Sequence, residues 1–155
     1  MKKVVVAIDG SDASRAVIDY AIHYAVREKD AELLFLHVIG ASESRSPFVA
    51  GYKVDLTESE KEAKDRFESY VGECLENSGV EPERFSVWVR TGNSCANIID
   101  FADEKDADII MIGHRGMSRL NRFFIGSVAA RVVANAPCSV YVHRPRGKSP
   151  APEGV

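Results

Sequence analysis

Apolar residues along this chain fall into two alternating patterns. Short continuous runs rich in β-branched residues are typical of strands that are covered on both faces. Between them, apolar positions recur every three or four residues, which predicts helices with one buried side. One run, Phe85–Val89, alternates polar and apolar residues more than the others, which predicts a strand nearer a sheet edge. The five predicted strands are Val4–Ile8, Leu33–Ile39, Phe85–Val89, Ala107–Ile112 and Cys138–Val142.

Polar residues that follow the runs predict where the helices begin. Ser11 is a candidate N-cap of the first helix, because a serine oxygen can accept a hydrogen bond from the first helical turn. Thr57-Glu58-Ser59-Glu60 is predicted to form a capping box for the second helix, and Gly79 to stop it. The other two helices are predicted to begin at Asn93 or Ser94 and at Gly126-Ser127.

Five strands that alternate with four helices indicate an α/β domain built on a mostly parallel sheet. We expect one domain over residues 1–144, with a loop over residues 40–56 and a disordered tail over residues 145–155. In sheets of this kind, ligands bind beyond the carboxyl ends of the strands, where the strand order reverses. The segments that follow the predicted strands are therefore the candidate site.

The composition narrows the classes of function. The 155 residues are 45% hydrophobic, which excludes a mainly disordered chain. A net charge of −3 gives no electrostatic basis for general binding to nucleic acid or to an anionic membrane. No segment approaches the ~20 apolar residues that cross a bilayer, and Cys74, Cys95 and Cys138 form no CxxC pair or zinc-ligand cluster. We therefore expect a cytoplasmic protein with reduced thiols and no metal site.

The most informative motif follows the fourth predicted strand and reads Gly-x2-Gly-x9-Gly-Ser, with glycines at positions 113, 116 and 126. Glycines let the backbone approach a ligand closely, and the N–H groups that open a helix bind anions. The N–H groups of Gly126, Ser127 and Val128 are predicted to point at a phosphate, and Arg115 adds a positive charge. Each glycine alone is more typical of a turn or cap, but their combined spacing favours an anion cradle. The motif is neither a Walker loop nor the Gly-x-Gly-x2-Gly fingerprint.

Three further residues have two interpretations each. Asp9, at the end of the first strand, could accept a ribose hydroxyl or assist a magnesium ion, and its alternative role is to cap the helix that follows. His37 lies within a buried strand and is interpreted as a satisfied core histidine rather than a catalyst. Trp88 is interpreted as core or edge packing rather than a stacking platform.

With these residues and motifs, the chain resembles the universal stress proteins over residues 3 to about 143. In that family the complete glycine motif marks the ATP-binding branch. The resemblance implies a single-domain three-layer sandwich of the Rossmann-like, adenine nucleotide alpha hydrolase-like kind, whose five-stranded parallel sheet has the order 3-2-1-4-5. It rests on Val4–Asp9, Leu36-His37-Val38, Ala107–Gly113, the glycine motif, and Gly126–Ala129 leading to Ala136-Pro137-Cys138.

The resemblance also implies an ATP site across the first and fourth strands, with Mg²⁺ as a candidate companion. Family members are commonly dimers that pair through the last strand, which here is Cys138–Val142. Carried over by position, Ala7, Ile8 and Asp9 line the base and ribose, and Val38 contacts the adenine. Ile112 and Gly113 flank the ribose and first phosphate, and the phosphates are held by Gly116, Gly126, Ser127 and Val128.

The expected function is that of a nucleotide-responsive regulator in the stress response. A general base or a water-positioning residue is not recognisable beside the phosphate cradle, so efficient catalysis is not expected. Three alternatives stay open from the sequence. They are a slow ATPase or autophosphorylating protein, a sensor of AMP or a cyclic nucleotide, and a structural dimer with a vestigial site.

Overall fold

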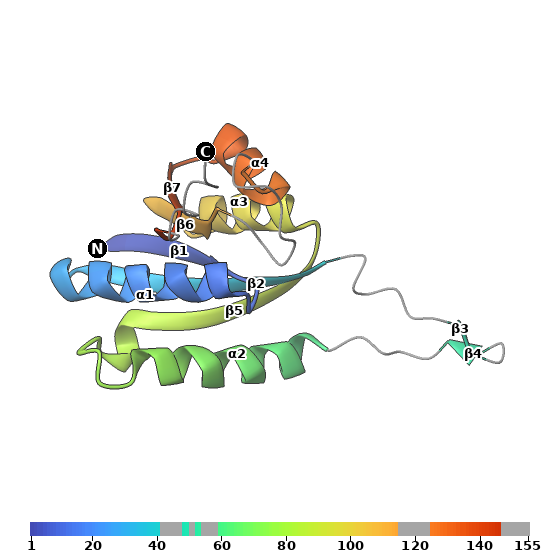
Figure 1. Ribbon diagram of the computed structural model, residues 1–155, viewed down its shortest axis with the longest axis horizontal. Coiled ribbons are helices and arrows are strands. Elements are labelled where there is room, and N and C mark those ends of the chain that lie inside the picture. Colours follow the sequence, from blue (N-terminus) through green and yellow to red (C-terminus); the bar gives the residue numbers. More distant parts are fainter. Residues whose placement is uncertain (41–47, 50–51, 54–58, 115–124, 147–155) are drawn as a thin grey trace, which may run out of the picture.

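The fold is a five-stranded parallel sheet with the order β5-β2-β1-β6-β7. The computed structural model describes residues 1–40, 48–49, 52–53, 59–114 and 125–146. Numbered within the sheet, this order is 3-2-1-4-5, which confirms the prediction, and every neighbouring pair is parallel. Figure 1 shows the sheet running from β5 at one edge to β7 at the other. The strands are β1 (Lys2–Ile8), β2 (Ala31–Gly40), β5 (Phe85–Gly92), β6 (Ile109–Gly113) and β7 (Ser139–His143).

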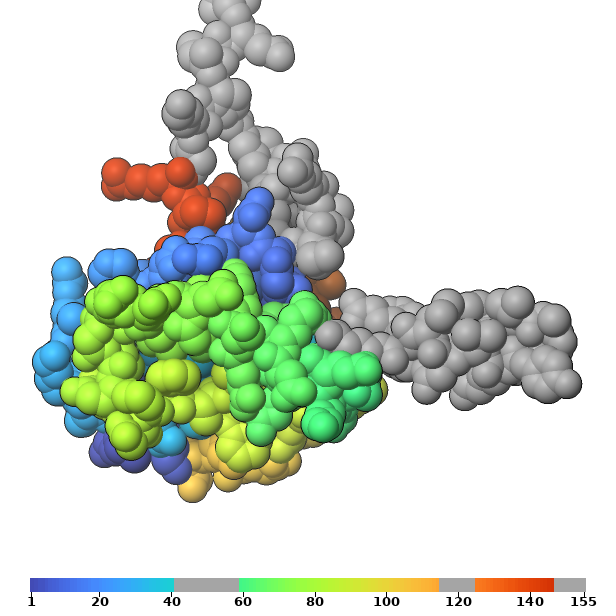
Figure 2. Space-filling view, turned by 90° about the horizontal axis from the view of Figure 1, so that it is seen from below, coloured from blue at the N-terminus to red at the C-terminus, as the bar shows by residue number. Residues whose placement is uncertain are grey.

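Four helices cover the two faces of this sheet. The first face packs against α1 (Asp12–Arg27) and α2 (Glu60–Leu75), and Figure 2 looks onto the side that α2 covers. The second face packs against α3 (Ser94–Glu104) and α4 (Ser127–Asn135). A short 3-10 helix, η1 (Pro82–Arg84), leads into β5.

Alternation along β1 divides the core into two layers. Val4 and Val6 face α1 and α2, whereas Val5 faces α3 and α4, and all three are fully buried. Because both sides of the strand are buried, it needs the continuous apolar run seen in the sequence. At the edge strand β5, polar and apolar residues alternate as predicted, and Trp88 is 38% exposed and packs on Phe101.

Several predicted helix ends differ from the structure. The capping box of α2 is formed by Ser59 and Glu62, two residues later than predicted, since both of its hydrogen bonds form there. The same helix stops at Leu75, before Gly79, because the C-cap Glu76 already has a non-helical ψ of 128°, and Asn77 follows with a positive φ of 59°. For α3, the N-cap is Asn93, which decides between the two candidates.

The predicted loop over residues 40–56 carries a small element of its own. The strands β3 (Phe48–Val49) and β4 (Tyr52–Lys53) form an antiparallel pair. Two-residue strands leave too little periodicity to be read from sequence, so this pair was not predicted. Gly40 is the last residue of β2, and the remaining residues of the predicted loop, together with the predicted tail from residue 147 on, lie outside the described residues.

Arg84 joins three elements at the end of the sheet that lies away from the candidate site. Its guanidinium donates to the backbone carbonyls of Ala25 and Glu28 at the end of α1 and of Ala31 at the start of β2, at 2.9–3.1 Å. The last carbonyls of a helix have no partner within the helix, so a charged donor stabilises them. The side chain is only 15% exposed, which limits competition from water.

We expect Arg84→Met to lower the free energy of unfolding by about 2–3 kcal/mol, because partly buried carbonyls lose a charged donor. Urea unfolding, followed by the fluorescence of the single tryptophan, measures this change. As a control, Arg131→Met on the exposed surface of α4 is expected to change stability by no more than about 0.5 kcal/mol. Equal effects of the two substitutions would show that the carbonyl contacts of Arg84 contribute nothing particular.

Candidate functional site

The candidate site lies where the chain leaves β1 and β6 in opposite directions. From β1 the chain continues to β2 on one side, whereas β6 continues to β7 on the other. Carboxyl ends of neighbouring parallel strands diverge at such a point and leave room for a ligand. The strand β1 ends at Ile8 and β6 ends at Gly113, so these ends define the position of the site.

Four of the predicted site residues belong to the same apolar layer of the core. Ala7, Val38, Ile112 and Val128 all belong to the apolar layer that α3 and α4 cover. Ile112 is 6% exposed, whereas the other three are only partly buried and pack at the border of the layer. Ala7, Val38 and Ile112 lie near the carboxyl ends of their strands, so this edge of the layer is apolar, as a site for a planar base requires.

The turn between β1 and α1 is closed by three hydrogen bonds. The carboxylate of Asp9 accepts from the Ser11 N–H at 2.9 Å, and the Asp9 N–H donates to the hydroxyl of Ser14 at 3.1 Å. Ser11 is the N-cap of α1, as predicted, and its hydroxyl accepts from the Ser14 N–H. Asp9 is therefore not the cap itself, and one of its carboxylate oxygens orders the turn that precedes the cap.

Two features of this turn were missed by sequence reasoning. Ser14 is 4% exposed and acts as a hydrogen-bond acceptor inside the first turn of α1, where it looked like an ordinary helix position. Gly10 has a φ of +79°, a conformation that L side chains rarely adopt. The signal that could have found Gly10 is its position directly after a buried strand and before a helix cap.

The N-terminus of α4 lies at the end of β6. The Gly126 N–H donates to the His114 carbonyl at 2.8 Å, and the His114 N–H donates to the His143 carbonyl of β7 at 2.8 Å. These bonds hold the two ends of the glycine motif together. The Gly126 N–H, which was predicted to point at a phosphate, donates to the His114 carbonyl here.

Of the three N–H groups predicted to face a phosphate at the start of α4, those of Ser127 and Val128 make no hydrogen bond within the helix, because these are its first two residues. Gly126, the N-cap, contributes no side-chain hydrogen bond, and Ser127 is exposed. The positive end of the helix dipole adds to the attraction for an anion. Arg115 and Gly116 lie outside the described residues.

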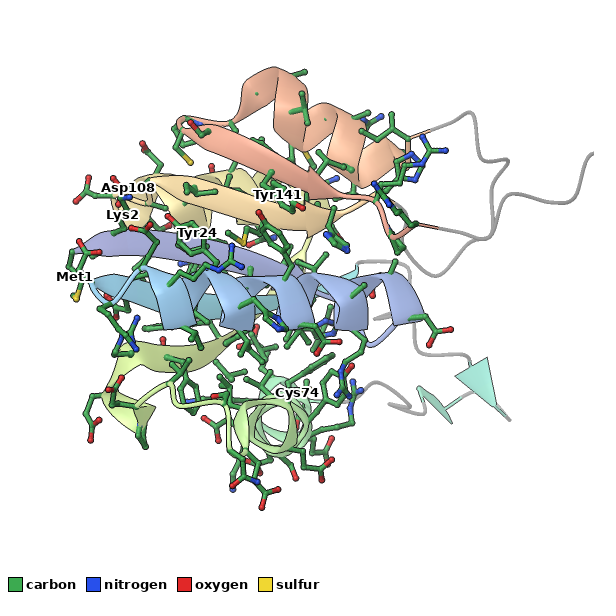
Figure 3. All side chains as sticks on the ribbon, turned by 60° about the vertical axis from the view of Figure 1, so that its left-hand side comes forward. Met1, Lys2, Tyr24, Cys74, Asp108 and Tyr141 are labelled. Carbon is green, nitrogen blue, oxygen red and sulfur yellow. The ribbon has the colours of Figure 1, made fainter. Side chains whose placement is uncertain are left out.

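The ionisable groups around the core do not form a nucleophilic centre in the described part of the chain. Burial raises the pKa of the Cys74 and Cys138 thiols, which keeps them protonated and poorly nucleophilic near neutral pH; Figure 3 labels Cys74 on α2. His37 is 8% exposed and bonded to the Ile8 carbonyl, as the interpretation of a satisfied core histidine requires. Among the described residues, no group of three His, Cys, Asp or Glu could hold a metal ion.

A parallel α/β sheet with a helix N-terminus at its switch point defines the class of nucleotide-binding-like folds. The family model described as "Universal stress protein family" matches residues 1–144. The chain therefore belongs to the universal stress protein family. None of the helices in the described segments is long and apolar enough to cross a membrane.

Relatives of known sequence extend along nearly the whole chain. A universal stress protein of Methanocaldococcus jannaschii is 35% identical over 145 residues, which are 91% of this chain and 81% of the relative. The universal stress protein YxiE of Bacillus subtilis is 30% identical over 146 residues, or 92% of this chain and 98% of the relative.

Solved structures share the fold. The hypothetical protein MJ0577 has a TM-score of 0.75 and 23% identity, covering 95% of this chain and 98% of its own. A universal stress protein solved in complex with cAMP has a TM-score of 0.65 and 22% identity, covering 92% and 96% of the two chains. The universal stress protein of Archaeoglobus fulgidus in complex with dAMP has a TM-score of 0.60 and 25% identity, also covering 92% and 96%.

The positive φ of Gly10 can be tested by comparing alanine substitutions at two glycines, Gly10 and Gly72. Gly10→Ala is expected to lower the free energy of unfolding by about 1–2 kcal/mol, because a Cβ strains this left-handed conformation. Gly72→Ala, inside α2 with open space around the new methyl group, is expected to raise it by about 0.5–1 kcal/mol. Thermal or urea unfolding of both variants measures the opposite signs. A Gly10→Ala variant as stable as the wild type would contradict the strained turn.

Proposed function

We propose that this protein is an ATP-binding universal stress protein that acts in the cytoplasm as a nucleotide-responsive regulator. The observation that carries the proposal is the hydrogen bond between Gly126 and the His114 carbonyl, which holds the N-terminus of α4 at the carboxyl end of β6. An anion-binding helix end thus lies beside the apolar surface that contains Ala7, Val38 and Val128. The dAMP bound to the relative from Archaeoglobus fulgidus supports an adenine nucleotide as the ligand.

Each part of a nucleotide has candidate partners at this edge. The base would lie on Ala7 and Val38, and the ribose would lie near Asp9 and between the ends of β1 and β6. The phosphates would accept hydrogen bonds from the N–H groups of Ser127 and Val128, whose position at the start of α4 favours a negatively charged ligand. The family resemblance adds Ile8, Ile112, Gly113, Gly116 and Gly126 to this set, and the glycine motif adds Arg115.

Such a site would regulate the protein through thermodynamic linkage between nucleotide binding and conformation. A nucleotide that binds one conformation more tightly shifts the population toward that conformation and changes what the surface presents to a partner. The cAMP bound to another member of the fold keeps an adenylate sensor open as the second candidate function. Slow ATP hydrolysis, or autophosphorylation, would show as phosphate release or a labelled residue in the presence of Mg²⁺.

Removing a single N–H group from the start of α4 tests the phosphate cradle. Proline is well accepted at the first helical position, and the ψ of 150° at Gly126 suits the residue before a proline. Ser127→Pro is therefore expected to preserve the helix while weakening ATP binding about 10- to 100-fold, since a hydrogen bond to a charged group contributes ~1.5–3 kcal/mol. Ser127→Ala removes the hydroxyl and keeps the N–H, so comparing the two variants separates the contribution of the hydroxyl to ATP affinity from that of the N–H.

The measurement is calorimetric titration with ATP, ADP, AMP and cAMP, each with and without Mg²⁺. Ser94→Pro is the matched control, because Ser94 is the first residue of α3 after an extended N-cap and lies at no predicted phosphate contact. Tight binding of AMP or cAMP with weak binding of ATP would favour the adenylate sensor. No binding of any of the four nucleotides at millimolar concentration would sink the proposal and leave the structural dimer as the remaining function.

We further propose that two copies pair through β7. This strand is an edge of the sheet, where it pairs with β6 alone among the described strands. An edge strand presents unpaired backbone groups that a second copy can satisfy. Tyr141, which Figure 3 labels on β7, stacks on Tyr20 of α1 with a centroid distance of 4.2 Å. Tyr20 is 37% exposed, so an aromatic pair adjoins this edge.

Analytical ultracentrifugation is expected to give about twice the chain mass of 17.0 kDa. Tyr141→Glu places a charge at the β7 edge and is expected to shift the equilibrium toward the monomer by at least about tenfold in the dissociation constant. Trp88→Glu alters a partly exposed aromatic residue at the opposite edge, on β5, and is expected to leave the dimer intact. A monomeric wild-type protein, or a dimer lost only with Trp88→Glu, would contradict pairing through β7.

A further inference from the structure

The hydrogen bond that satisfies the buried His37 also fixes the end of β1, directly before the candidate site. The histidine side chain is 8% exposed, and its Nδ1 lies 2.9 Å from the carbonyl oxygen of Ile8, its register partner on the neighbouring strand β1. A carbonyl oxygen can only accept, so Nδ1 carries the proton and donates it. The imidazole thus holds the last carbonyl of β1, immediately before the chain enters the candidate site.

The peptide unit between Ile8 and Asp9 is consequently held at both ends. His37 binds its carbonyl, and the buried hydroxyl of Ser14 accepts its N–H at 3.1 Å. A peptide unit is planar, so two fixed ends determine the orientation of the whole group. That orientation directs the chain into Asp9 and Gly10, where the turn makes its remaining hydrogen bonds.

Phe67 of α2 supports the imidazole from the side. Its ring is 1% exposed, and its centroid lies 4.2 Å from that of His37 at an interplanar angle of 33°. The tip of the same ring would lie 4.0 Å from a Cβ on Gly10, so Phe67 borders both the histidine and the turn. Such dense packing leaves the imidazole few alternative rotamers. The second helix therefore contacts the turn through one aromatic ring.

We infer that His37 is a positioning residue of the nucleotide site, acting through the Ile8 carbonyl to hold the turn over Asp9–Ser11 in its binding conformation. This inference rests on the proposed function, because it concerns the affinity of that same site. It differs from ligand contact, since the histidine acts through the backbone of a neighbouring strand. It also connects nucleotide affinity with α2, whose Phe67 keeps the imidazole in place.

Two substitutions at His37 separate the hydrogen bond from the bulk of the side chain. His37→Asn places an amide N–H close to the position of Nδ1 and retains the donor. His37→Leu has a similar volume but no donor, and leaves the Ile8 carbonyl without its partner. We expect His37→Leu to weaken binding of the tightest nucleotide roughly tenfold, as is typical when a coupled residue is changed, and His37→Asn to restore affinity to within about threefold.

The control for general destabilisation is Val80→Ala, which truncates the same core layer in the turn that follows α2. It is expected to lower the melting temperature without changing nucleotide affinity. Phe67→Leu keeps the donor but removes the supporting ring, and is expected to weaken binding less than His37→Leu does. Equal affinity of wild type and His37→Leu would overturn the inference, as would failure of His37→Asn to restore it in a variant of comparable stability.

Amide hydrogen exchange of the nucleotide-free proteins gives a readout that needs no ligand. The amides of Asp9 and Ser11 are expected to exchange at least about tenfold faster in His37→Leu than in wild type, and near the wild-type rate in His37→Asn. If no nucleotide binds the wild type but this exchange pattern is found, the proposed function fails and the hold on the turn stands. If nucleotide binds and exchange is unchanged in His37→Leu, the positioning role fails while the function stands.

Discussion

The burial of β1 on both faces, and its pairing along both edges, is the constraint on which the rest of the structure depends. Val4, Val5 and Val6 are completely inaccessible to solvent, and the strand is bonded to β2 on one side and β6 on the other. A strand in this position must be apolar throughout, because both of its faces are covered. The site follows from this constraint, because the connections diverge where β1 ends.

The two faces of the sheet contribute different parts of the site. The face that α3 and α4 cover supplies the apolar surface and the helix end suited to phosphate. The face that α1 and α2 cover supplies the contact that holds the Ile8 carbonyl, through His37 and Phe67. A ligand at the edge of the sheet would therefore touch groups whose positions depend on both core layers.

The sequence predicted the elements well, because their patterns depend on burial along a single strand or helix. All five strands and four helices of the main fold were found, and the resemblance supplied the order of the strands. The start of α2 was misplaced by two residues, since Thr57 and Ser59 offer the same local chemistry and only the folded helix selects one. Local patterns therefore predict which helices and strands form more reliably than they predict the residue at which each one ends.

The candidate site was predictable to a lesser extent, for a different physical reason. Glycine spacing indicated where a phosphate could bind, but it could not show that the Gly126 N–H would be used by the His114 carbonyl. Likewise, the burial of His37 was evident from its strand, whereas its bond to Ile8 depends on the register between β1 and β2. Hydrogen bonds between segments that are distant in sequence depend on the tertiary geometry. No local pattern of residues in a single sequence indicates that geometry.

The proposed site would be suited to regulation, because the same hydrogen bonds would serve both stability and nucleotide binding. A ligand that binds only the folded, ordered turn stabilises it in proportion to the logarithm of ligand concentration over the dissociation constant. Since His37 and Phe67 connect that turn with α2, ordering of the turn by a ligand would also favour one placement of this helix. Nucleotide occupancy could thus be read at a surface that the nucleotide does not touch.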